Sequence, residues 1–139
     1  MDVLTKEQRT KNMKAIKSKN TLIERMIAGE LWKRGYRYRR NTKKIFGKPD
    51  FVFIRLKVAI FCDSDFFHGK DWEVNNERIK SNRDFWIPKI EGNMIRDQLV
   101  TSTLITEGWT VIRLWESDIK RDLNRCIEMI INKIDERKQ

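Results

Sequence analysis

Residues 48–69 read KPDFVFIRLKVAIFCDSDFFHG, and their pattern predicts two short strands joined by a tight turn. A β-rich apolar run at 51–54 follows Pro-Asp, and a second apolar run at 58–62 follows a polar interruption. The second run ends in acidic residues, and His68, the single histidine of the chain, comes shortly after. Carboxylates at the ends of adjacent strands offer the oxygen ligands that Mg²⁺ prefers, and they are costly to gather without a positive partner. The stretch therefore indicates either a metal-dependent active site or a surface hairpin with acidic turns.

The chain of 139 residues is long enough for one domain with its own core. Its 40% hydrophobic and 36% charged residues are typical of a globular protein rather than a disordered one. The two cysteines, Cys62 and Cys126, form no ligand-spaced cluster, so we expect reduced thiols in an intracellular protein. No apolar run has the length of a membrane span, and the N-terminus lacks a hydrophobic signal core. We therefore expect a cytoplasmic protein.

Positive charge is concentrated in the first third of the chain. Residues 1–48 hold 15 Lys/Arg against 4 Asp/Glu, whereas residues 49–139 hold 15 against 16. A polyanion bound by the basic third would be led to the acidic hairpin, and nucleic acid is the best candidate. A membrane surface is disfavoured because the basic residues do not form one amphipathic helix. A basic surface that only aids solubility, or a ribosome- or RNA-associated protein, would explain the charge but not the acidic strand ends.

Helices and strands alternate after a basic arm at 1–20, which is either flexible or orders on DNA. A single domain covers 21–139. In chain order we expect a helix of about 14 residues beginning after Thr21, strands near 36–40, 50–55 and 57–62, a long loop at 69–83, a helix near 87–107 with Pro88 in its first turn and Gly108 at its end, a strand at 109–115, and a last helix capped by Ser117.

This order predicts an α/β fold in which a mixed sheet is flanked by helices on both faces. The fourth strand is reached through a helix, so it should run parallel to a central strand by a right-handed crossover. Cys126 lies on the apolar stripe of the last helix and is expected in the core. Glu24 ends a capping box that begins at Thr21, so it either bonds back to Thr21 or points toward the acidic hairpin, and the sequence favours the cap.

The α-β-β-β-α-β order, with Pro49-Asp50 at the start of the second strand, resembles the core of the restriction-endonuclease-like nucleases. Those nucleases usually carry Glu-x-Lys on the third strand, where this chain reads Cys62-Asp63-Ser64. With a histidine nearby, this departure resembles the very-short-patch mismatch-repair endonucleases, the Vsr family. The matching segments are RTKNMKAI at 9–16, SKNTLIE at 18–24, GKPDFV at 47–52, VAIF at 58–61, Asp63, FFHG at 66–69, Phe85-Trp86, Lys89-Ile90, Asn93, Arg96-Asp97, EGWTV at 107–111 and Trp115-Glu116.

The resemblance implies a role for each acidic residue and for the histidine. Asp50 would be the principal Mg²⁺ ligand, helped by the main-chain carbonyl of Cys62, and Glu24 would hold metal-bound water. His68 would transfer a proton near the scissile phosphate, and Asp63 and Asp97 would support it. These roles suit phosphodiester hydrolysis, which needs cations on the phosphate oxygens and a group that moves a proton near neutral pH.

The resemblance also implies how DNA is recognised. Phe66, Phe67 and Trp86 match an aromatic wedge that enters the helix beside a T:G mismatch, where unstacking is cheapest. Phe85, in contrast, is expected to be ordinary core. The other matching positions are Lys89 and Asn93, which would read bases, and Met13, Ile16 and Lys19 of the arm, of which Met13 and Ile16 would contact the minor groove.

The chain departs from the family at a structural zinc site that the family builds from cysteines and histidine. The expected cysteine positions read Asp65, Lys70 and Ser117, so we predict no structural zinc. The loop after the third strand must then be held in another way, for example by Asp65 pairing with a nearby Lys or Arg.

We therefore predict a Mg²⁺-dependent DNA endonuclease that nicks one strand at T:G mismatches, such as those left by deamination of 5-methylcytosine. Its partner would be double-stranded DNA, with mismatch-repair proteins as further partners, and we expect it to act as a monomer. Two alternatives stay open: a related restriction or homing endonuclease with the same catalytic residues, and a DNA-binding module without activity.

Overall fold

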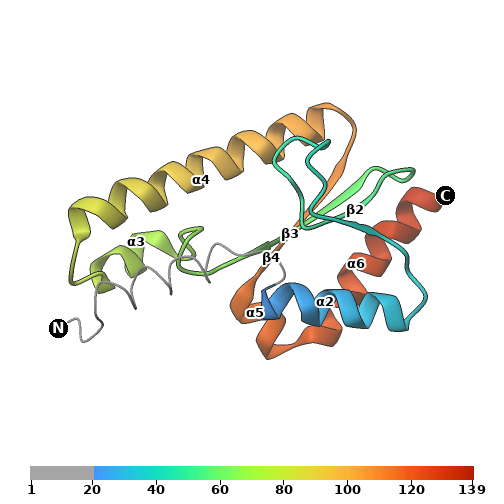
Figure 1. The fold of residues 1–139 in the computed structure, drawn as a ribbon, viewed down its shortest axis with the longest axis horizontal. Coiled ribbons are helices and arrows are strands. Elements are labelled where there is room, and N and C mark those ends of the chain that lie inside the picture. The colour runs from blue at the N-terminus through green and yellow to red at the C-terminus, as the bar shows by residue number, and fades with distance from the viewer. Residues whose placement is uncertain (1–20) are drawn as a thin grey trace.

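The computed structural model describes residues 21–139, which form a four-stranded sheet with helices on both faces (Figure 1). The predicted arm at 1–20 lies outside the described residues. In chain order the elements are α2 (Leu22–Lys33), β1 (Arg39–Arg40), β2 (Phe51–Phe53), β3 (Val58–Asp63), α3 (Trp72–Asn75), the 3₁₀ helix η1 (Asn76–Arg78), α4 (Arg83–Thr106), β4 (Thr110–Trp115), α5 (Glu116–Arg121) and α6 (Leu123–Lys138). The predicted α/β class is confirmed.

The sheet is mixed and has the order β1-β2-β3-β4. Short connections make β1, β2 and β3 antiparallel neighbours, with Phe51 opposite Ile60. The chain reaches β4 through α4, and β4 pairs parallel to β3, from Val58 opposite Thr110 to Asp63 opposite Trp115. Both pairings agree with the sequence prediction, because a hairpin suits antiparallel strands and a helical connection suits parallel ones.

Alternation along the strands divides the core into two layers. One face of the sheet, with Phe51 and Ile60, packs against α2, α5 and α6. The other face, with Val52, Ala59 and Phe61, packs against α4. β3 is therefore covered on both sides, which explains its almost unbroken apolar sequence. Cys126 lies in the first of these layers, as predicted.

Several boundaries differ from the sequence prediction. The strand expected near 36–40 is shortened to Arg39–Arg40. The segment at 69–83 is not a structureless loop, since it contains α3 and η1. α4 begins at Arg83, so Pro88 lies beyond its first turn, and the helix tolerates the loss of one backbone hydrogen bond over its 24 residues. The predicted last helix is two helices, because the Asp122 side chain accepts a hydrogen bond from the Arg125 N–H (3.2 Å) and starts α6 anew. Ser117 does not cap a helix; it lies within α5.

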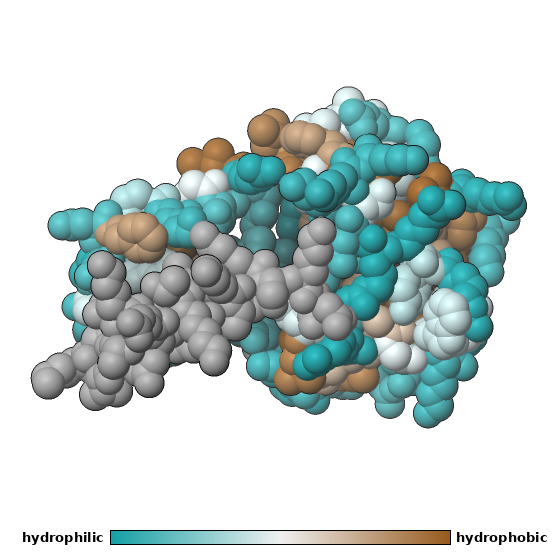
Figure 2. Space-filling view, in the orientation of Figure 1, coloured by the Kyte–Doolittle hydropathy of each residue, from teal (hydrophilic) through white to brown (hydrophobic). Residues whose placement is uncertain are grey.

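Only one stripe of α4 reaches the sheet. Ile90, Val100 and Leu104 are buried, whereas Ile95 and Leu99 are exposed. Figure 2 shows hydrophobic residues over α4 on a face that is otherwise mainly hydrophilic. Within residues 21–139, no helix combines the length and the apolar character that crossing a bilayer requires.

Gly47 shapes the loop that leads into Pro49-Asp50. Its φ of +82° favours glycine, and a β carbon there would overlap the Val100 side chain of α4. We expect Gly47→Ala to lower the free energy of unfolding by about 2–4 kcal/mol, measured by urea denaturation. Gly29→Ala is the matched control: it lies in α2 with no neighbour within 4 Å of the added carbon, and it should gain about 0.5–1 kcal/mol. Equal midpoints for the two variants would contradict this account.

Candidate active site

The acidic residues and the histidine predicted from the sequence gather at one edge of the sheet. Two adjoining cavities, of about 420 and 830 Å³, share Asp50, Cys62, His68 and Asn93 in their walls. Asp63 and Asp97 line the first cavity, and Glu24 lines the second. The structure therefore brings together side chains from α2, the start of β2, the end of β3, the following loop and α4.

Asp50 is held at this edge by the strand beside it. The Cys62 N–H donates a hydrogen bond of 2.7 Å to Asp50 Oδ2. A residue in an extended strand directs its N–H and its carbonyl to the same side, so the Cys62 carbonyl also faces Asp50. Burial raises the pKa of Asp50 to about 7, with the charges of Glu24 and Asp63 adding to the rise and the Cys62 N–H opposing it.

Glu24 caps α2 and also lines the larger cavity together with Asp50 and Cys62 of the acidic hairpin. Its Oε2 accepts hydrogen bonds from the Thr21 N–H (3.1 Å) and the Thr21 hydroxyl (3.0 Å), which completes the capping box. Its Oε1 is buried and has no hydrogen-bond partner within the described part of the chain, while Arg40 Nη2 lies 3.7 Å away. One oxygen therefore caps α2, and the other forms an ion pair with Arg40 but no hydrogen bond among the described residues.

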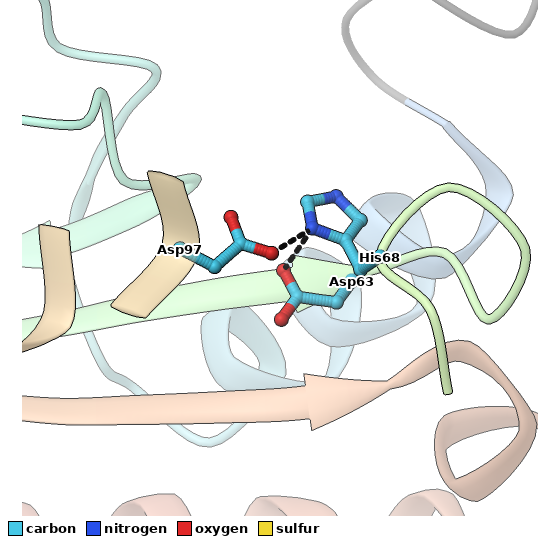
Figure 3. Close-up of side chains that lie close together, drawn as sticks. All are labelled: Asp63, His68 and Asp97. Carbon is cyan, nitrogen blue, oxygen red and sulfur yellow. Dashed lines mark hydrogen bonds and ion pairs between the residues drawn. The ribbon is translucent and has the colours of Figure 1, made fainter. Parts of the chain in front are cut away.

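His68 is held by Asp97 and Asp63 (Figure 3). Its Nδ1–H donates to Asp97 Oδ2 at 2.5 Å, and Asp63 Oδ1 lies 3.7 Å from the same nitrogen. The other ring nitrogen, Nε2, is directed away from both carboxylates. Burial acts to lower the pKa of His68, but the hydrogen bond to Asp97 and the charges of Asp63 and Asp97 outweigh it and raise the pKa. Burial raises the pKa of Asp63, whereas the positive charges of His68 and Arg113 act to lower it.

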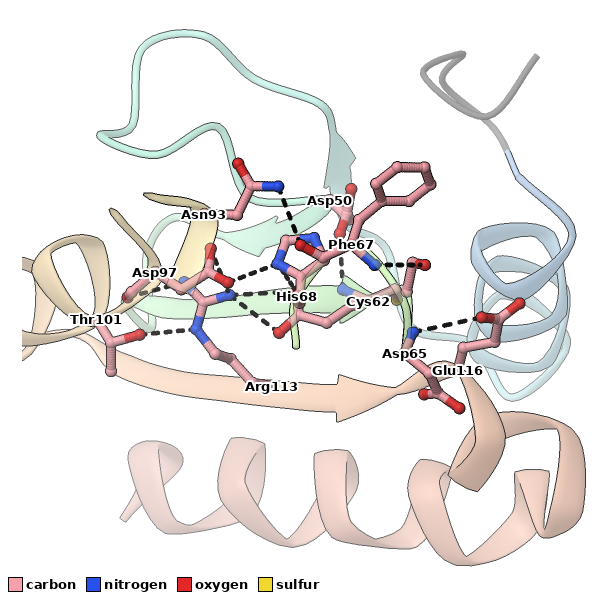
Figure 4. A network of polar contacts seen from close by, with 12 residues as sticks. Asp50, Cys62, Asp65, Phe67, His68, Asn93, Asp97, Thr101, Arg113 and Glu116 are labelled. Carbon is pink, nitrogen blue, oxygen red and sulfur yellow. Dashed lines mark hydrogen bonds and ion pairs between the residues drawn. The ribbon is translucent and has the colours of Figure 1, made fainter. Parts of the chain in front are cut away.

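Arg113 joins this network and was not predicted from the sequence. It lies on β4 and donates to both carboxylate oxygens of Asp63, at 3.2 and 3.1 Å (Figure 4). The available signal was a charged residue inside the apolar run at 109–115, WTVIRLW. A strand position between buried neighbours suggests that the charge has a partner, but the sequence does not say which one.

The donor set around Asp50 suits a hard divalent cation. It offers the Asp50 carboxylate, the Cys62 carbonyl and Glu24 Oε1, which makes no hydrogen bond among the described residues, and all three are oxygen atoms of the kind that Mg²⁺ binds. Asp63, His68 and Asp97 also have ligand atoms within 4.8 Å of one another. There, however, the Arg113 guanidinium already neutralises Asp63, so we favour the Asp50 side for a cation.

An aromatic cluster lies beside the site. The ring centroid of Trp86 is 5.1 Å from that of Phe66, 5.8 Å from that of Phe67 and 4.9 Å from that of Phe85. Phe85 is 54% exposed, so its prediction as a core residue was wrong: only one stripe of α4 faces the sheet, and Phe85 packs on Trp86 instead. Asn93 donates to the Phe67 carbonyl (3.0 Å) and so supports this cluster.

The remaining predicted DNA contacts fall into two groups. Lys89 lines the larger cavity together with Glu24 and His68. Met13, Ile16 and Lys19 lie outside the described residues.

The positions expected for zinc-binding cysteines form a hydrogen-bonded clamp of Asp65, Lys70 and Ser117. Lys70 Nζ donates to the Ser117 hydroxyl at 2.6 Å, and the Ser117 N–H donates to Asp65 Oδ1 at 3.2 Å. An ammonium group has no lone pair for a metal, and the set offers no sulfur, so these residues do not fit zinc. The predicted direct pairing of Asp65 with a Lys or Arg is not observed; both Asp65 and Lys70 bind Ser117, which ties the loop to α5.

Comparison with protein families matches residues 1–74 to the family described as DNA mismatch endonuclease Vsr. This chain belongs to the Vsr family. It is 51% identical over 130 residues to type II nicking enzyme V.NmeDIP of Neisseria meningitidis serogroup C, covering 94% of this chain and 88% of the relative. It is 52% identical over 123 residues to type II nicking enzyme V.HpaIIP of Haemophilus parainfluenzae, covering 88% and 87%. It is 31% identical over 136 residues to DNA mismatch endonuclease Vsr of Escherichia coli strain K12, covering 97% and 86%.

Membership of the Vsr family makes this protein a DNA endonuclease. The family and the enzyme class inferred from the sequence are thereby confirmed.

Asp50 gives the Vsr site a testable pH dependence. With a pKa of about 7, Asp50 of the metal-free protein must lose a proton before it can bind a cation, so Mg²⁺ affinity should be about tenfold weaker at pH 6 than at pH 8. Because the pKa is raised on folding, this group stabilises the metal-free fold at acid pH, and the contribution is lost as the pH rises through about 7. Calorimetric titration with Mg²⁺ in two buffers measures affinity and proton release together. Asp50→Asn should release no proton; release equal to the parent's would contradict the assignment.

Ser117→Ala tests the clamp. It removes the hydroxyl that Lys70 reaches but keeps the backbone bond to Asp65, so we expect a loss of about 1–2 kcal/mol and faster amide exchange in the loop at 64–82. Ser102→Ala, which removes an exposed hydroxyl bonded within α4, is the control and should change neither. One equivalent of tightly bound zinc in the parent, measured by elemental analysis, would overturn the clamp as the holder of this loop.

Proposed function

We propose that this protein is a Mg²⁺-dependent endonuclease that nicks one strand of duplex DNA at T:G mismatches, such as those produced by deamination of 5-methylcytosine. The observation that carries the proposal is the position of the Asp50 oxygen set and His68 in adjoining cavities, beside exposed aromatic rings. The E. coli relative, whose name is DNA mismatch endonuclease, supports mismatch recognition.

In this proposal Asp50 and the Cys62 carbonyl hold Mg²⁺, which when bound supplies positive charge to the phosphate oxygens. Glu24 Oε1, which is buried and makes no hydrogen bond among the described side chains, orients water at the same edge. His68 transfers a proton through Nε2, because Nδ1 is occupied by Asp97. Asp63 and Asp97 hold the imidazole in place and stabilise its charged form.

Recognition in this proposal comes from the aromatic cluster. Phe66, Phe67 and Trp86 enter the duplex at the mispaired step, where unstacking costs least. Exposed Phe85 extends the same surface. Lys89 and Asn93 contact the bases next to it, and Met13, Ile16 and Lys19 of the basic arm follow the minor groove. The proposed catalytic side chains come from one chain, so a monomer suffices, with mismatch-repair proteins acting on the nick.

A second candidate is favoured by the names of two relatives. V.NmeDIP and V.HpaIIP are called type II nicking enzymes, a name that supports strand nicking without specifying a mismatch, so this chain is alternatively a related restriction or homing endonuclease. The chemistry would be the same, and the difference would lie in the sequence around the cleaved bond.

The test compares end-labelled duplexes that differ only in T:G or C:G at one position, with Mg²⁺ and with EDTA. We expect nicking of the T strand that requires both the metal and the mismatch.

His68→Gln should lower the rate constant about 10²–10⁴-fold. Asp50→Asn should abolish the response to Mg²⁺, while the exposed Asp135→Asn should match the parent. Metal-dependent cutting that ignores the mismatch would reject the recognition model, and binding without cutting would favour a DNA-binding module.

A further inference from the structure

Arg113 forms more polar contacts than the neutralisation of Asp63 requires. Besides Asp63, its Nη2 donates to the Asp97 main-chain carbonyl at 3.3 Å, and its Nε donates to the Thr101 hydroxyl at 2.7 Å. Its Nη1 also lies 3.7 Å from Asp97 Oδ1. Each nitrogen of the guanidinium is thus engaged, and the partners come from β3 and α4 while Arg113 itself lies on β4 (Figure 4).

We propose that Arg113 is a positioning residue for the nicking reaction: it holds Asp63 and Asp97 in place and, through them, fixes the imidazole of His68. This inference rests on the proposed function, because it assigns Arg113 to the same site.

The geometry restricts the guanidinium on every side. Its donors form a planar fork, so the bonds to Asp63, Asp97 and Thr101 can be made together in only one orientation. The ring of Phe61 lies under it, 4.1 Å from Cζ to the ring centroid, and closes one face. A displaced Arg113 would lose several bonds at once, so the carboxylates it holds are fixed before any substrate binds.

The charges give a second, independent reason. Asp63 and Asp97 meet at the same imidazole nitrogen, and two carboxylates so close together repel unless a cation lies between them. Arg113 is within 4.0 Å of both. It therefore supplies the positive charge that a metal ion would otherwise bring to this cluster, and this leaves the Asp50 side as the favoured place for a cation within residues 21–139.

The main variants are Arg113→Met, which removes the charge and the donors, and Arg113→Lys, which keeps the charge but not the fork. For Arg113→Met we expect a single-turnover nicking rate about 10–100-fold below the parent, the range found when residues that support a site are changed. Two other quantities should stay within about twofold of the parent: the affinity for the mismatched duplex and the Mg²⁺ concentration for half-maximal rate. Arg113 forms its hydrogen bonds with Asp63, Asp97 and Thr101 and not with the aromatic cluster or Asp50. Arg113→Lys should recover part of the rate. Arg121→Met, an exposed arginine that pairs with Asp118, is the matched control and should match the parent.

The single histidine provides a readout that does not depend on nicking. In the DNA-free parent, the Nδ1–H of His68 should give a downfield proton resonance, protected from exchange by Asp97. Arg113→Met should lose or broaden that resonance while keeping the amide spectrum of a folded protein. If Arg113→Met does not fold, Thr101→Val takes its place, because it removes only the hydroxyl that orients Nε and should lower the rate about three- to tenfold.

Three outcomes would overturn the inference: a parental nicking rate in these variants, an unchanged His68 resonance, or a loss of rate fully explained by weaker DNA binding. A parent that nicks no duplex is a different failure, that of the proposed function, and the His68 resonance would still decide the role of Arg113.

Discussion

Buried and half-buried carboxylates must find donors or cations, and this requirement organises the edge of the sheet where the site lies. Asp50 accepts a hydrogen bond from the Cys62 N–H, and Glu24 accepts one from the Thr21 N–H at the start of α2. Asp63 and Asp97 are paired with Arg113 and His68. What is left unsatisfied is informative. The pKa of Asp50 is raised to about 7, and Glu24 keeps one buried oxygen that forms an ion pair with Arg40 but no hydrogen bond among the described residues. The Asp50 side is therefore the less fully neutralised part of the site.

The sheet makes this convergence possible. β2 and β3 are antiparallel, so the residue before β2 and the last residues of β3 meet at one end. β4 runs parallel to β3, which places Arg113 opposite Phe61 and beside the carboxylates. Burial on both faces fixes the register of β3, because a shift by one residue would turn every buried side chain to the wrong face. The packing of the core therefore determines the positions of the polar groups.

Much of the fold could be predicted from the sequence because local patterns encode it. Apolar runs gave β3 and β4, the capping box gave the start of α2, and Cys126 fell on a helical stripe. The misses were of two kinds. α3 and the break at Asp122 are short features whose signals are weak over a few residues. The partners of Arg113 and Lys70 lie 50 and 47 residues away, and no local pattern names a partner at that distance.

The residues of the candidate site also fall into those that the sequence predicted and those that only the structure could place. Residues in recognisable motifs, such as Asp50 and His68, could be assigned from the resemblance to the Vsr family, and the structure brings them together. Phe85 could not be assigned, because a helix with one buried stripe leaves the direction of each side chain open until its rotation is known. The position of Glu24 could not be predicted in full either, since only the structure shows that its two oxygens have different surroundings.

The clamp of Asp65, Lys70 and Ser117 also bears on the cellular conditions that the protein tolerates. A clamp made of a hydroxyl, a carboxylate and an ammonium group contains no thiolate that peroxide could oxidise and no ion that a chelator could withdraw. Burial raises the pKa of the Cys62 thiol well above its ordinary value, which favours the protonated form. The loop thus keeps its tie to α5 in the presence of peroxide or a chelator, either of which would weaken a tie made by a thiolate-bound metal.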